Sequence, residues 1–317
     1  ARSAAPVTLL SCDNLRHNGD RFRAGFLEFL GHRGLSALRA WVASRTTSPN
    51  SMVDRITPRP NGAVAARVKA ATGVADEVAV MSEAFCQWVI EDRFAAGRPD
   101  WEVVGVEMVA SVDKHEEAKI RLLNATHSCI AWAGTLRGLT YIHESIGEPA
   151  IRQMAFDYMT RDAIPCLTRT EGSAPIDLCA YRDLVLDRFS NPHLGDTNQR
   201  VASDSYAKIA GFILPTIRDC LSRGDDFASA AMLPALFFEF LGRVRRGELP
   251  YDYQDAEMEP GTLASLFADS DPIRRFCRES RLWGALADSE RLVSAIRAAH
   301  RRVLDFARYD HADRASS

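Results

Sequence analysis

A short apolar run near the start of the chain limits its possible folds most strongly. Residues 6–12 (PVTLLSC) have the length and composition of a buried strand, and the polar turn at residues 13–20 (DNLRHNGD) ends it. A buried parallel strand needs neighbours in its sheet, and the residues before this run cannot supply them. The run is therefore either the last strand of a sheet formed by residues outside this sequence, or it pairs with a later segment. The strand-like, valine-rich residues 101–112 (WEVVGVEMVASV) are the candidate for such a segment.

The sequence contains no glycine-rich phosphate loop. Neither GxGxxG nor GxxxxGK[ST] occurs in the 317 residues. These motifs place backbone N–H groups at a helix start, where they bind the phosphates of a nucleotide. A complete dinucleotide-binding domain is therefore not expected within this sequence.

Charge and hydropathy argue against several classes of partner. The 39 Lys and Arg residues are interspersed with 42 Asp and Glu residues, for a net charge of −3, whereas a nucleic-acid surface normally shows a basic excess. No apolar run approaches the roughly 18 residues that cross a bilayer, and no apolar signal segment follows Arg2. The seven scattered cysteines never form a CxxC pair, which favours reduced thiols in a cytoplasmic protein over a disulfide or zinc framework.

From about residue 20 onward the pattern is mostly helical. Apolar residues recur at three- and four-residue intervals in the segments 21–42, 113–136, 196–214, 227–246 and 288–309. Proline and glycine mark loops, but no clean linker and no internal repeat. We therefore expect a mostly α fold, in which residues 21–317 form one helical domain and residues 1–20 are the remnant of another.

The most informative segment for chemistry is residues 113–127 (DKHEEAKIRLLNATH). On a helix with about 100° per residue, Glu116, Asn124 and His127 fall within an arc of roughly 140° that begins at Lys119. The same arc contains the apolar residues that should face the core, which are Ile120, Leu123 and Ile130. Polar and core-seeking side chains are therefore predicted to share one face.

A lysine on such a face has a distinctive chemistry. Burial among Ile and Leu disfavours the ammonium form and lowers the lysine pKa, so that Lys119 can accept a proton from an alcohol near neutral pH. The amide of Asn124 can donate a hydrogen bond to the developing oxyanion. A purely structural interpretation is a surface pair between Glu116 and Lys119 and a buried histidine, and periodicity alone favours it.

Two further clusters contain charged residues in unusual settings. Arg200, Asp204 and Lys208 follow one another at four-residue spacing, which predicts a helical stripe that either binds hydroxyl groups or forms a solvated salt-bridge ladder. The pair Asp54 and Arg55 stands in an apolar stretch between two prolines. A structural bridge and a substrate contact explain that pair equally well.

These segments together resemble the mannitol dehydrogenase family of long-chain, metal-independent polyol dehydrogenases. Residues 49–58 (PNSMVDRITP) are similar to the signature of that family, and residues 119–128 (KIRLLNATHS) to its catalytic helix, written K-x-R-L-L-N-x-x-H-S. Residues 11–15 (SCDNL), 87–92 (QWVIED) and 200–208 match in order and approximate spacing. The resemblance extends from Thr8 to at least Pro215.

The resemblance implies a role for each catalytic residue. Lys119 is the general base that removes the hydroxyl proton, and Asn14 and Asn124 stabilise the oxyanion. His127 binds and orients the substrate, while Glu116 gates proton transfer to solvent. Ala125 and Thr126 stand where the family often has Gly and Ser, a mild change near Lys119.

The resemblance also implies the reaction. Asp54, Arg200 and Lys208 hold a sugar alcohol, which exchanges a hydride with NAD (or NADP) to give a ketose, without a metal ion. The fold implied is a helical catalytic domain preceded by the last strand of an otherwise missing Rossmann-type domain, so the chain is not expected to turn over alone. No pattern indicates an oligomer, and a monomer is expected.

Two alternatives remain open. An enzyme of the same fold that reduces a uronate, such as fructuronate or tagaturonate, would need additional cations facing the substrate carboxylate. A helical binding module without catalysis is the alternative outside the enzymes, and NADH binding to the chain would argue against it.

Overall fold

The computed structural model describes residues 5–58, 60, 62–169 and 176–308. The contacts of the chain divide it between Glu117 and Ala118 into two compact units, where the sequence analysis expected a division near residue 20. Within the described ranges, no helix combines the length and hydropathy that crossing a membrane requires.

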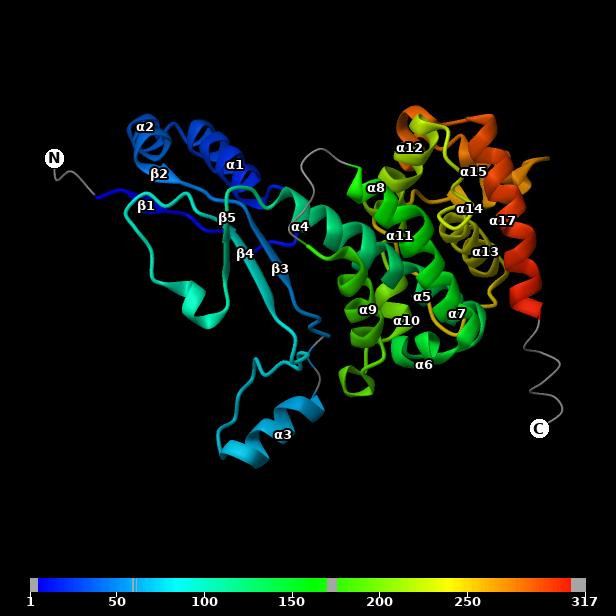
Figure 1. Ribbon diagram of the computed structural model, residues 1–317, viewed down its shortest axis with the longest axis horizontal. Coiled ribbons are helices and arrows are strands. Elements are labelled where there is room, and N and C mark those ends of the chain that lie inside the picture. The colour runs from blue at the N-terminus through cyan, green and yellow to red at the C-terminus, as the bar shows by residue number, and fades with distance from the viewer. Residues whose placement is uncertain (1–4, 59, 61, 170–175, 309–317) are drawn as a thin grey trace. The chain divides into compact units, whose positions relative to one another are not determined.

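The first unit mixes strands and helices (Figure 1). Strand β1 pairs in parallel with β2, and a second sheet has the order β3-β4-β5, with β3 antiparallel and β5 parallel to β4. Its elements are β1 (Val7–Thr8), α1 (Asn18–His32), α2 (Ser36–Arg45), β2 (Thr46–Thr47), β3 (Ser51–Asp54), α3 (Gly62–Thr72), β4 (Gln87–Glu91), the 3₁₀ helix η1 (Trp101–Val104), β5 (Glu107–Val109) and α4 (Asp113–Ala118).

Two helices connect the parallel strands β1 and β2. The sequence pattern predicts one helix over residues 21–42, but α1 ends at His32 and α2 begins at Ser36. Gly34 takes a φ of 67° in the turn between them, a conformation that glycine adopts without steric cost. A parallel pair needs such a crossover connection, so this part of the chain is α/β in character.

The structure therefore corrects the expected fold class. A mostly helical domain beginning after residue 20 is wrong, because strands continue at residues 46–54, 87–91 and 107–109. These strands are only two to five residues long, too short for an alternating pattern to stand out against the stronger helical repeats of α1 and α2. The partner of β1 is β2, and residues 101–112 instead contain η1 and β5.

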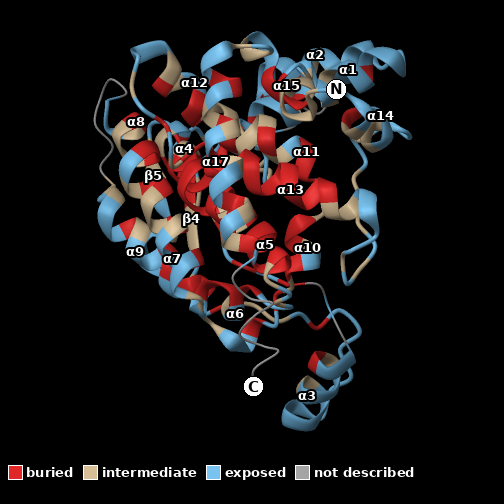
Figure 2. Ribbon diagram, turned by 90° about the vertical axis from the view of Figure 1, so that its right-hand side faces the viewer, coloured by how far each residue is buried: buried red, intermediate tan, exposed pale blue. Residues whose placement is uncertain are grey.

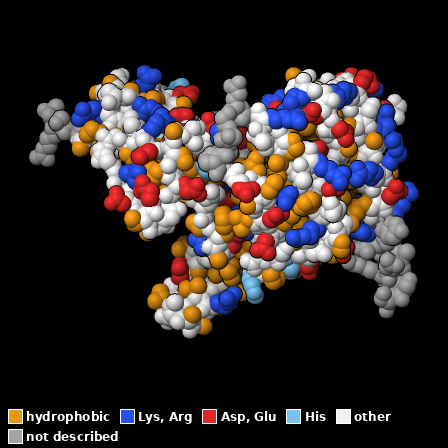
Figure 3. All heavy atoms as spheres, in the orientation of Figure 1, with side chains coloured by type: hydrophobic (Ala, Val, Ile, Leu, Met, Phe, Trp, Pro, Cys, Tyr) orange, Lys and Arg blue, Asp and Glu red, His pale blue; other side chains and the backbone are white. Residues whose placement is uncertain are grey.

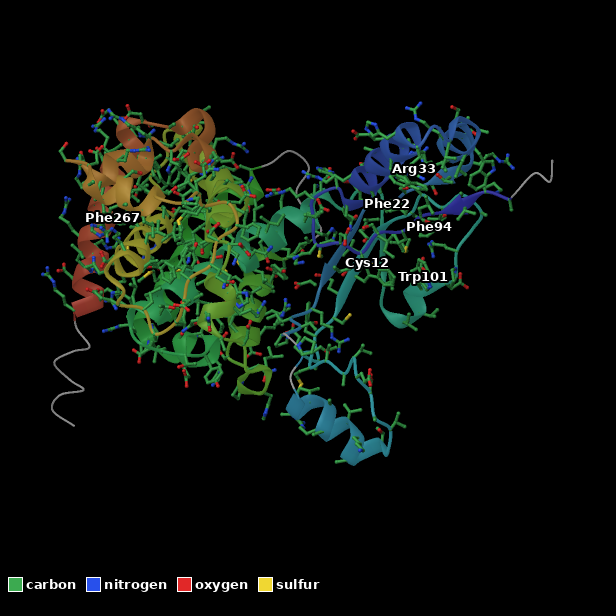
Figure 4. All side chains as sticks on the ribbon, turned by 180° about the vertical axis from the view of Figure 1, so that it is seen from behind. Cys12, Phe22, Arg33, Phe94, Trp101 and Phe267 are labelled. Atoms are coloured by element: carbon green, nitrogen blue, oxygen red, sulfur yellow. The ribbon has the colours of Figure 1, made fainter. Side chains whose placement is uncertain are left out.

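Small apolar and aromatic clusters hold the first unit together. Met52 of β3, Val89 of β4 and Val112 form a buried cluster across the second sheet. The ring of Trp101 stacks on Trp88 at 5.6 Å and meets the edge of Phe94 at 5.6 Å; Figure 4 labels Phe94 and Trp101. The clusters connect β4 with η1 and the loop between them.

The second unit is helical. Its elements are the π-helical segment η2 (Lys119–Asn124), α5 (Ala125–Leu136), α6 (Ile142–Gly147), α7 (Pro149–Asp157), the π-helical segment η3 (Tyr158–Ala163), α8 (Ile164–Thr168), α9 (Leu178–Phe189), the 3₁₀ helix η4 (Pro192–Leu194), α10 (Asn198–Ala202), α11 (Ser205–Lys208), the π-helical segment η5 (Ile209–Ile213), α12 (Leu214–Arg223), α13 (Met232–Arg246), α14 (Thr262–Ala268), α15 (Pro272–Cys277), α16 (Ser280–Trp283), the 3₁₀ helix η6 (Gly284–Leu286) and α17 (Glu290–Arg308).

Helices α5 and α13 form the centre of the second unit and are red over most of their length in Figure 2. Trp132 of α5 packs on Phe237 of α13 with a centroid distance of 5.1 Å, and its indole N–H donates to Ser205 Oγ at 2.9 Å. Phe237 also meets Phe276 of α15. Burying such a large ring removes apolar surface from water, which stabilises the fold by about 1.5–3 kcal/mol at each position.

Candidate active site

Lys119 lies where the helix changes its winding. The α-helix α4 passes directly into the π-helical segment η2, which Lys119 begins and Asn124 ends. A π-helix bonds residue i to i+5, so one residue more than usual fits into the turn. The α-helical angles used for residues 113–127 therefore do not hold after Lys119, although the helical run itself continues through α5. Such π segments are frequent at functional sites.

Lys119 is buried, with 7% of its surface exposed. Its neighbours in η2 include the buried residues Ile120 and Leu123, which the sequence analysis placed on the same face, and the buried Leu122, which it did not. Arg121, in the same segment, is also buried, and its guanidinium lies 2.6 Å from the carboxylate of Asp219 in α12. Asp219 thereby balances a buried positive charge two residues from Lys119.

His127, in the first turns of α5, contacts two residues that the sequence analysis missed. Its Nε2 lies 3.3 Å from Oδ2 of Asp196, and its ring stacks on Phe189 of α9 at 4.6 Å. Burial is the main cause that lowers the pKa of His127, although Asp196 opposes the shift. The imidazole is therefore held neutral, with one nitrogen to donate and one to accept a hydrogen bond.

Asp196 also binds Arg200. Two of the three guanidinium nitrogens of Arg200, Nε and Nη2, donate to the Asp196 carboxylate at 2.5 Å. Burial opposes ionisation of Asp196, but its interactions with His127 and Arg200 outweigh burial and hold its pKa well below the usual range. A single buried carboxylate thus joins two of the predicted site residues.

Lys208 ends α11 and points back at the previous helix. Its ammonium donates to the carbonyl oxygens of Val201 and Ser203 at 2.5 and 2.6 Å. Burial, with the nearby charge of Arg200, lowers the pKa of Lys208 to about 8. Two of its three N–H donors are used within the protein, which leaves one for another partner.

The predicted stripe of Arg200, Asp204 and Lys208 does not form. Asp204 has a φ of 54°, so α10 ends at Ala202 and α11 starts at Ser205. The carboxylate of Asp204 instead accepts a hydrogen bond from the backbone N–H of Ala256. The partner of Arg200 is four residues before it, and not four after it. An Asp-to-Arg spacing of four was visible in the sequence and could have identified Asp196.

Glu116 belongs to the first unit and is buried at 5% exposure. Its carboxylate accepts the backbone N–H of His17 at 3.1 Å, and Arg16 next to it binds Glu117 at 2.7 Å. Burial raises the pKa of Glu116, against the effect of the hydrogen bond from His17. A carboxyl group with a raised pKa exchanges protons more readily near neutral pH.

Asn14 stands in the loop between β1 and α1. The side chain of Asn18 fixes this loop, since its amide donates to the carbonyl oxygens of Ser11, Asp13 and Ser51. Close packing supports the arrangement, because a Cβ at Gly19 would lie 2.3 Å from the carbonyl oxygen of Pro49. The Asn50 and Ser51 region of the signature therefore positions the loop that contains Asn14.

Asp54 is the last residue of β3 and is buried at 2% exposure. The adjacent Arg55 is exposed, and its Nε donates to the carbonyl oxygen of Glu83 at 3.0 Å. The contact of Arg55 with Glu83 is structural.

One group of side chains in the described ranges brings three possible metal ligands within 4.8 Å of one another. It consists of His17, Asp113 and Glu116. His17 and Asp113 are exposed, and Glu116 already accepts the backbone N–H of His17. Exposed acidic groups of this kind are common without a metal ion.

The site residues of the second unit can perform proton transfer and hydrogen bonding. They comprise two amines, an amide, a neutral imidazole and a guanidinium neutralised by Asp196. No group of this kind accepts a hydride, so oxidation or reduction of a carbon centre here needs a redox cofactor. Figure 3 shows acidic and basic side chains interspersed on the visible face of this unit.

Two family models match the chain. The model described as "Mannitol dehydrogenase C-terminal domain" matches residues 111–304, and the model described as "Mannitol dehydrogenase Rossmann domain" matches residues 1–103. The second match overturns the expectation that the Rossmann-type domain is missing apart from its last strand in residues 1–20. It agrees with the strands and crossover helices of the first unit.

Named relatives and a solved structure are similar along most of the chain. A D-arabinitol 4-dehydrogenase of Ralstonia nicotianae is 56% identical over 302 residues (95% of this chain, 64% of that protein). One of Klebsiella pneumoniae is 51% identical over 297 residues (94% and 64%). The structure of Pseudomonas fluorescens mannitol 2-dehydrogenase with NAD and D-mannitol has a TM-score of 0.78 and 32% identity, covering 95% of this chain and 62% of that one. The chain thus spans less than two thirds of the length of these proteins.

Proposed function

The chain belongs to the mannitol dehydrogenase family, and from this premise we propose that it provides the catalytic residues of an NAD-dependent polyol dehydrogenase. The resemblance seen in the sequence motifs is confirmed by these matches. The observation that best supports the activity is the buried Lys119 at the start of η2, followed within eight residues by Asn124 and His127. The nicotinamide ring supplies the hydride acceptor that these side chains lack.

We propose that Lys119 is the general base of alcohol oxidation. Its neutral amine takes the proton of the substrate hydroxyl while the hydride leaves the same carbon. The Asn124 amide donates a hydrogen bond to the oxygen as its charge develops, which is worth several kcal/mol when the donor is fixed beforehand. The raised pKa of Glu116, three residues before Lys119, supports its proposed role in passing the proton to solvent.

His127, Arg200 and Lys208 are proposed to hold the remaining hydroxyls. A neutral imidazole accepts or donates a hydrogen bond, and Lys208 keeps one N–H donor beyond its two backbone contacts. For the first unit, oxyanion stabilisation by Asn14 and substrate binding by Asp54 are proposals that follow from the family motifs. The variants Asn14→Ala and Asp54→Ala test each of them separately.

The electrostatics of this cluster favour a neutral substrate. Asp196 neutralises Arg200 and His127 is uncharged, so a substrate carboxylate would gain little from these two residues. Lys208 is the remaining cation of the cluster, and burial already disfavours its charged form. This argues for a polyol over a uronate. Among polyols, the names of the two relatives above 50% identity favour D-arabinitol, oxidised at its fourth carbon, over mannitol oxidised at its second.

The proposal is tested by following NADH formation by the purified full-length protein. We expect turnover with D-arabinitol, slower turnover with D-mannitol and none with D-mannonate. The same assay is repeated with NADP in place of NAD, and we expect the enzyme to prefer NAD. A preference for mannonate would support the uronate alternative, and saturable ligand binding without any turnover would support the binding module.

We further propose that the reaction needs no metal ion. EDTA treatment should leave the rate unchanged, whereas a loss of activity that Zn²⁺ or Mg²⁺ restores would contradict this proposal and make His17, Asp113 and Glu116 the first ligands to mutate. The monomeric state and the cytoplasmic location expected from the sequence stay predictions.

A further inference from the structure

Cys166 and Cys220 lie side by side inside the second unit. Cys166 belongs to α8 and Cys220 to α12, and their sulfur atoms are 3.5 Å apart. Both residues are buried, with exposures of 1% and 2%. A disulfide has a sulfur–sulfur distance of about 2.05 Å, so the two atoms need to approach by roughly 1.5 Å to form one.

A guanidinium group contacts this pair. Nη2 of Arg223 lies 2.8 Å from Sγ of Cys166, and Nε of the same side chain donates to Asp225 at 2.9 Å. The Arg223 side chain is 29% exposed, so it extends from the buried sulfur to solvent. A small oxidant would have to displace Arg223 to reach the buried Cys166.

The electrostatic setting favours the Cys166 thiolate. The pKa of Cys166 is lowered to about 7, mainly by its hydrogen bond with the Cys220 thiol. Arg223 also lowers this pKa, whereas burial and the charge of Asp219 raise it. The pKa of Cys220 is raised by the same interaction, so Cys220 keeps its proton. At neutral pH a substantial fraction of Cys166 is therefore the nucleophilic thiolate.

The other buried thiols of the described residues have a different environment. Burial raises the pKa of both Cys129 and Cys277 to about 12. Cys12 (labelled in Figure 4), Cys86 and Cys179 are exposed. Only the pair in α8 and α12 combines a second sulfur within reach with an adjacent guanidinium, among the residues described.

We propose that Cys166 and Cys220 form an oxidisable thiol pair, which a hydroperoxide converts into a disulfide between α8 and α12. The Cys166 thiolate attacks one peroxide oxygen, the O–O bond breaks, and the released alkoxide takes up the proton that Cys166 lost. Cys220 then attacks the sulfur of the resulting sulfenic acid. The S–S bond forms, the S–O bond breaks, and hydroxide leaves as water with the proton of Cys220. Two thiols are oxidised and one hydroperoxide is reduced to an alcohol and water.

The test treats the folded full-length protein with hydrogen peroxide, blocks free thiols by alkylation and digests with trypsin without reduction. Cys166 lies in the tryptic peptide 162–169 (DAIPCLTR) and Cys220 in 219–223 (DCLSR), each with a single cysteine. We expect these two peptides to appear joined, and to separate on reduction. Full alkylation of both cysteines after peroxide, or links of either one to a different cysteine, would overturn the proposal.

Matched variants separate the pair from general thiol reactivity. Cys220→Ser should leave Cys166 trapped as a sulfenic acid that a dimedone probe labels, whereas Cys129→Ser should leave the 166–220 link unchanged. Arg223→Gln should slow link formation by about tenfold through a smaller thiolate fraction, and Arg223→Lys should retain most of the rate. Equal rates in the Gln and Lys variants and the unaltered protein would exclude the role given to Arg223. None of these readouts depends on the proposed dehydrogenase activity.

Discussion

Oδ2 of Asp196 lies 3.3 Å from Nε2 of His127. Because burial lowers the pKa of His127 while Asp196 stays ionised, the pair consists of a carboxylate and a neutral ring. A carboxylate only accepts, so this contact favours the tautomer that has its proton on Nε2, although the two atoms do not have the alignment of a full hydrogen bond. Asp196 thus biases the tautomer of His127 and, through Arg200, fixes a second side chain of the proposed substrate site.

Replacement of Asp196 by Asn should impair substrate binding through both neighbours. Asn keeps the size of the side chain but can present an N–H to His127 or to Arg200, and it removes the charge that balances Arg200. We expect kcat/KM for the polyol to fall by roughly tenfold to a hundredfold, with KM for NAD little changed. Steady-state kinetics of the full-length protein measure both constants.

The matched control is Asp183→Asn, which removes an exposed carboxylate of α9 bound only at the surface by Arg182. It should leave kcat/KM unchanged, because exposed ion pairs contribute little. If Asp196→Asn and Asp183→Asn have the same kinetics, the positioning role of Asp196 is wrong even when the protein is an active dehydrogenase.

The neutral state of His127 determines part of the pH dependence. Its pKa is lowered from the ordinary histidine value near 6.5, so the ring is neutral above that value and becomes charged only at lower pH. KM for the polyol should therefore show no histidine titration between about pH 6.5 and the region near pH 8 where Lys208 titrates, and His127 should raise it only below that range. A histidine-like inflection near pH 7 that disappears in His127→Asn would show that the ring titrates and contradict this account.

The proposed base is tested by Lys119→Ala. Loss of general base catalysis typically costs 10² to 10⁴ in rate, so we expect kcat to fall by about that factor, with a smaller change in KM. Lys114→Ala, on α4 of the same helical run, is the control and should keep near-normal turnover. Circular dichroism checks that both variants are folded. A folded Lys119→Ala variant with normal kcat would remove Lys119 from the mechanism.

Sequence patterns predicted the helical run that contains Lys119 better than they predicted its geometry. The helical run from Asp113 to Leu136 was recognisable because its apolar residues recur at three and four positions. The π-helical turn at Lys119 was not, since no residue type marks the insertion of one extra residue into a turn. The break at Asp204 was missed for a related reason, because a left-handed conformation at a non-glycine residue depends on tertiary contacts such as its bond to Ala256.

The fold of the first unit shows the same limit. Strands of two residues, such as β1 and β2, contain no period, and only their pairing in space identifies them. Asp196 could have been found by its spacing from Arg200, whereas its contact with His127 joins α5 to a loop nearly seventy residues later. Such long-range contacts are not encoded in local pattern.

The pair of Arg121 and Asp219 should hold η2 in place. Both side chains are largely buried, at 8% and 24% exposure, and lie 2.6 Å apart. Asp219→Ala leaves the guanidinium of Arg121 buried without this partner, which should cost about 2–3 kcal/mol of unfolding free energy and also lower kcat. Arg218→Ala removes an exposed arginine whose Nε lies 3.6 Å from the same carboxylate. This variant should change neither the unfolding free energy nor kcat. Urea unfolding and kinetics of both variants check the contrast.

Asp162 should make the stability of the second unit depend on pH. It is buried at 5% exposure, and burial raises its pKa to about 6 despite the hydrogen bond that Oδ2 accepts from the N–H of Ala230. In the unfolded chain an aspartate titrates near 3.9. Between these two values the folded state binds more protons, so this group contributes stability at low pH that is lost as the pH rises from about 4 through 6.

Asp162→Asn removes that titration while its side-chain oxygen can still accept the Ala230 N–H. After discounting for partial solvent screening, the variant should gain about 1–2 kcal/mol relative to the unaltered protein between pH 4 and pH 8. Asp305→Asn, at an exposed position of α17, should show no such trend. Urea unfolding across this pH range measures the difference. A constant difference between Asp162→Asn and the unaltered protein would mean that Asp162 does not carry a raised pKa in the folded state.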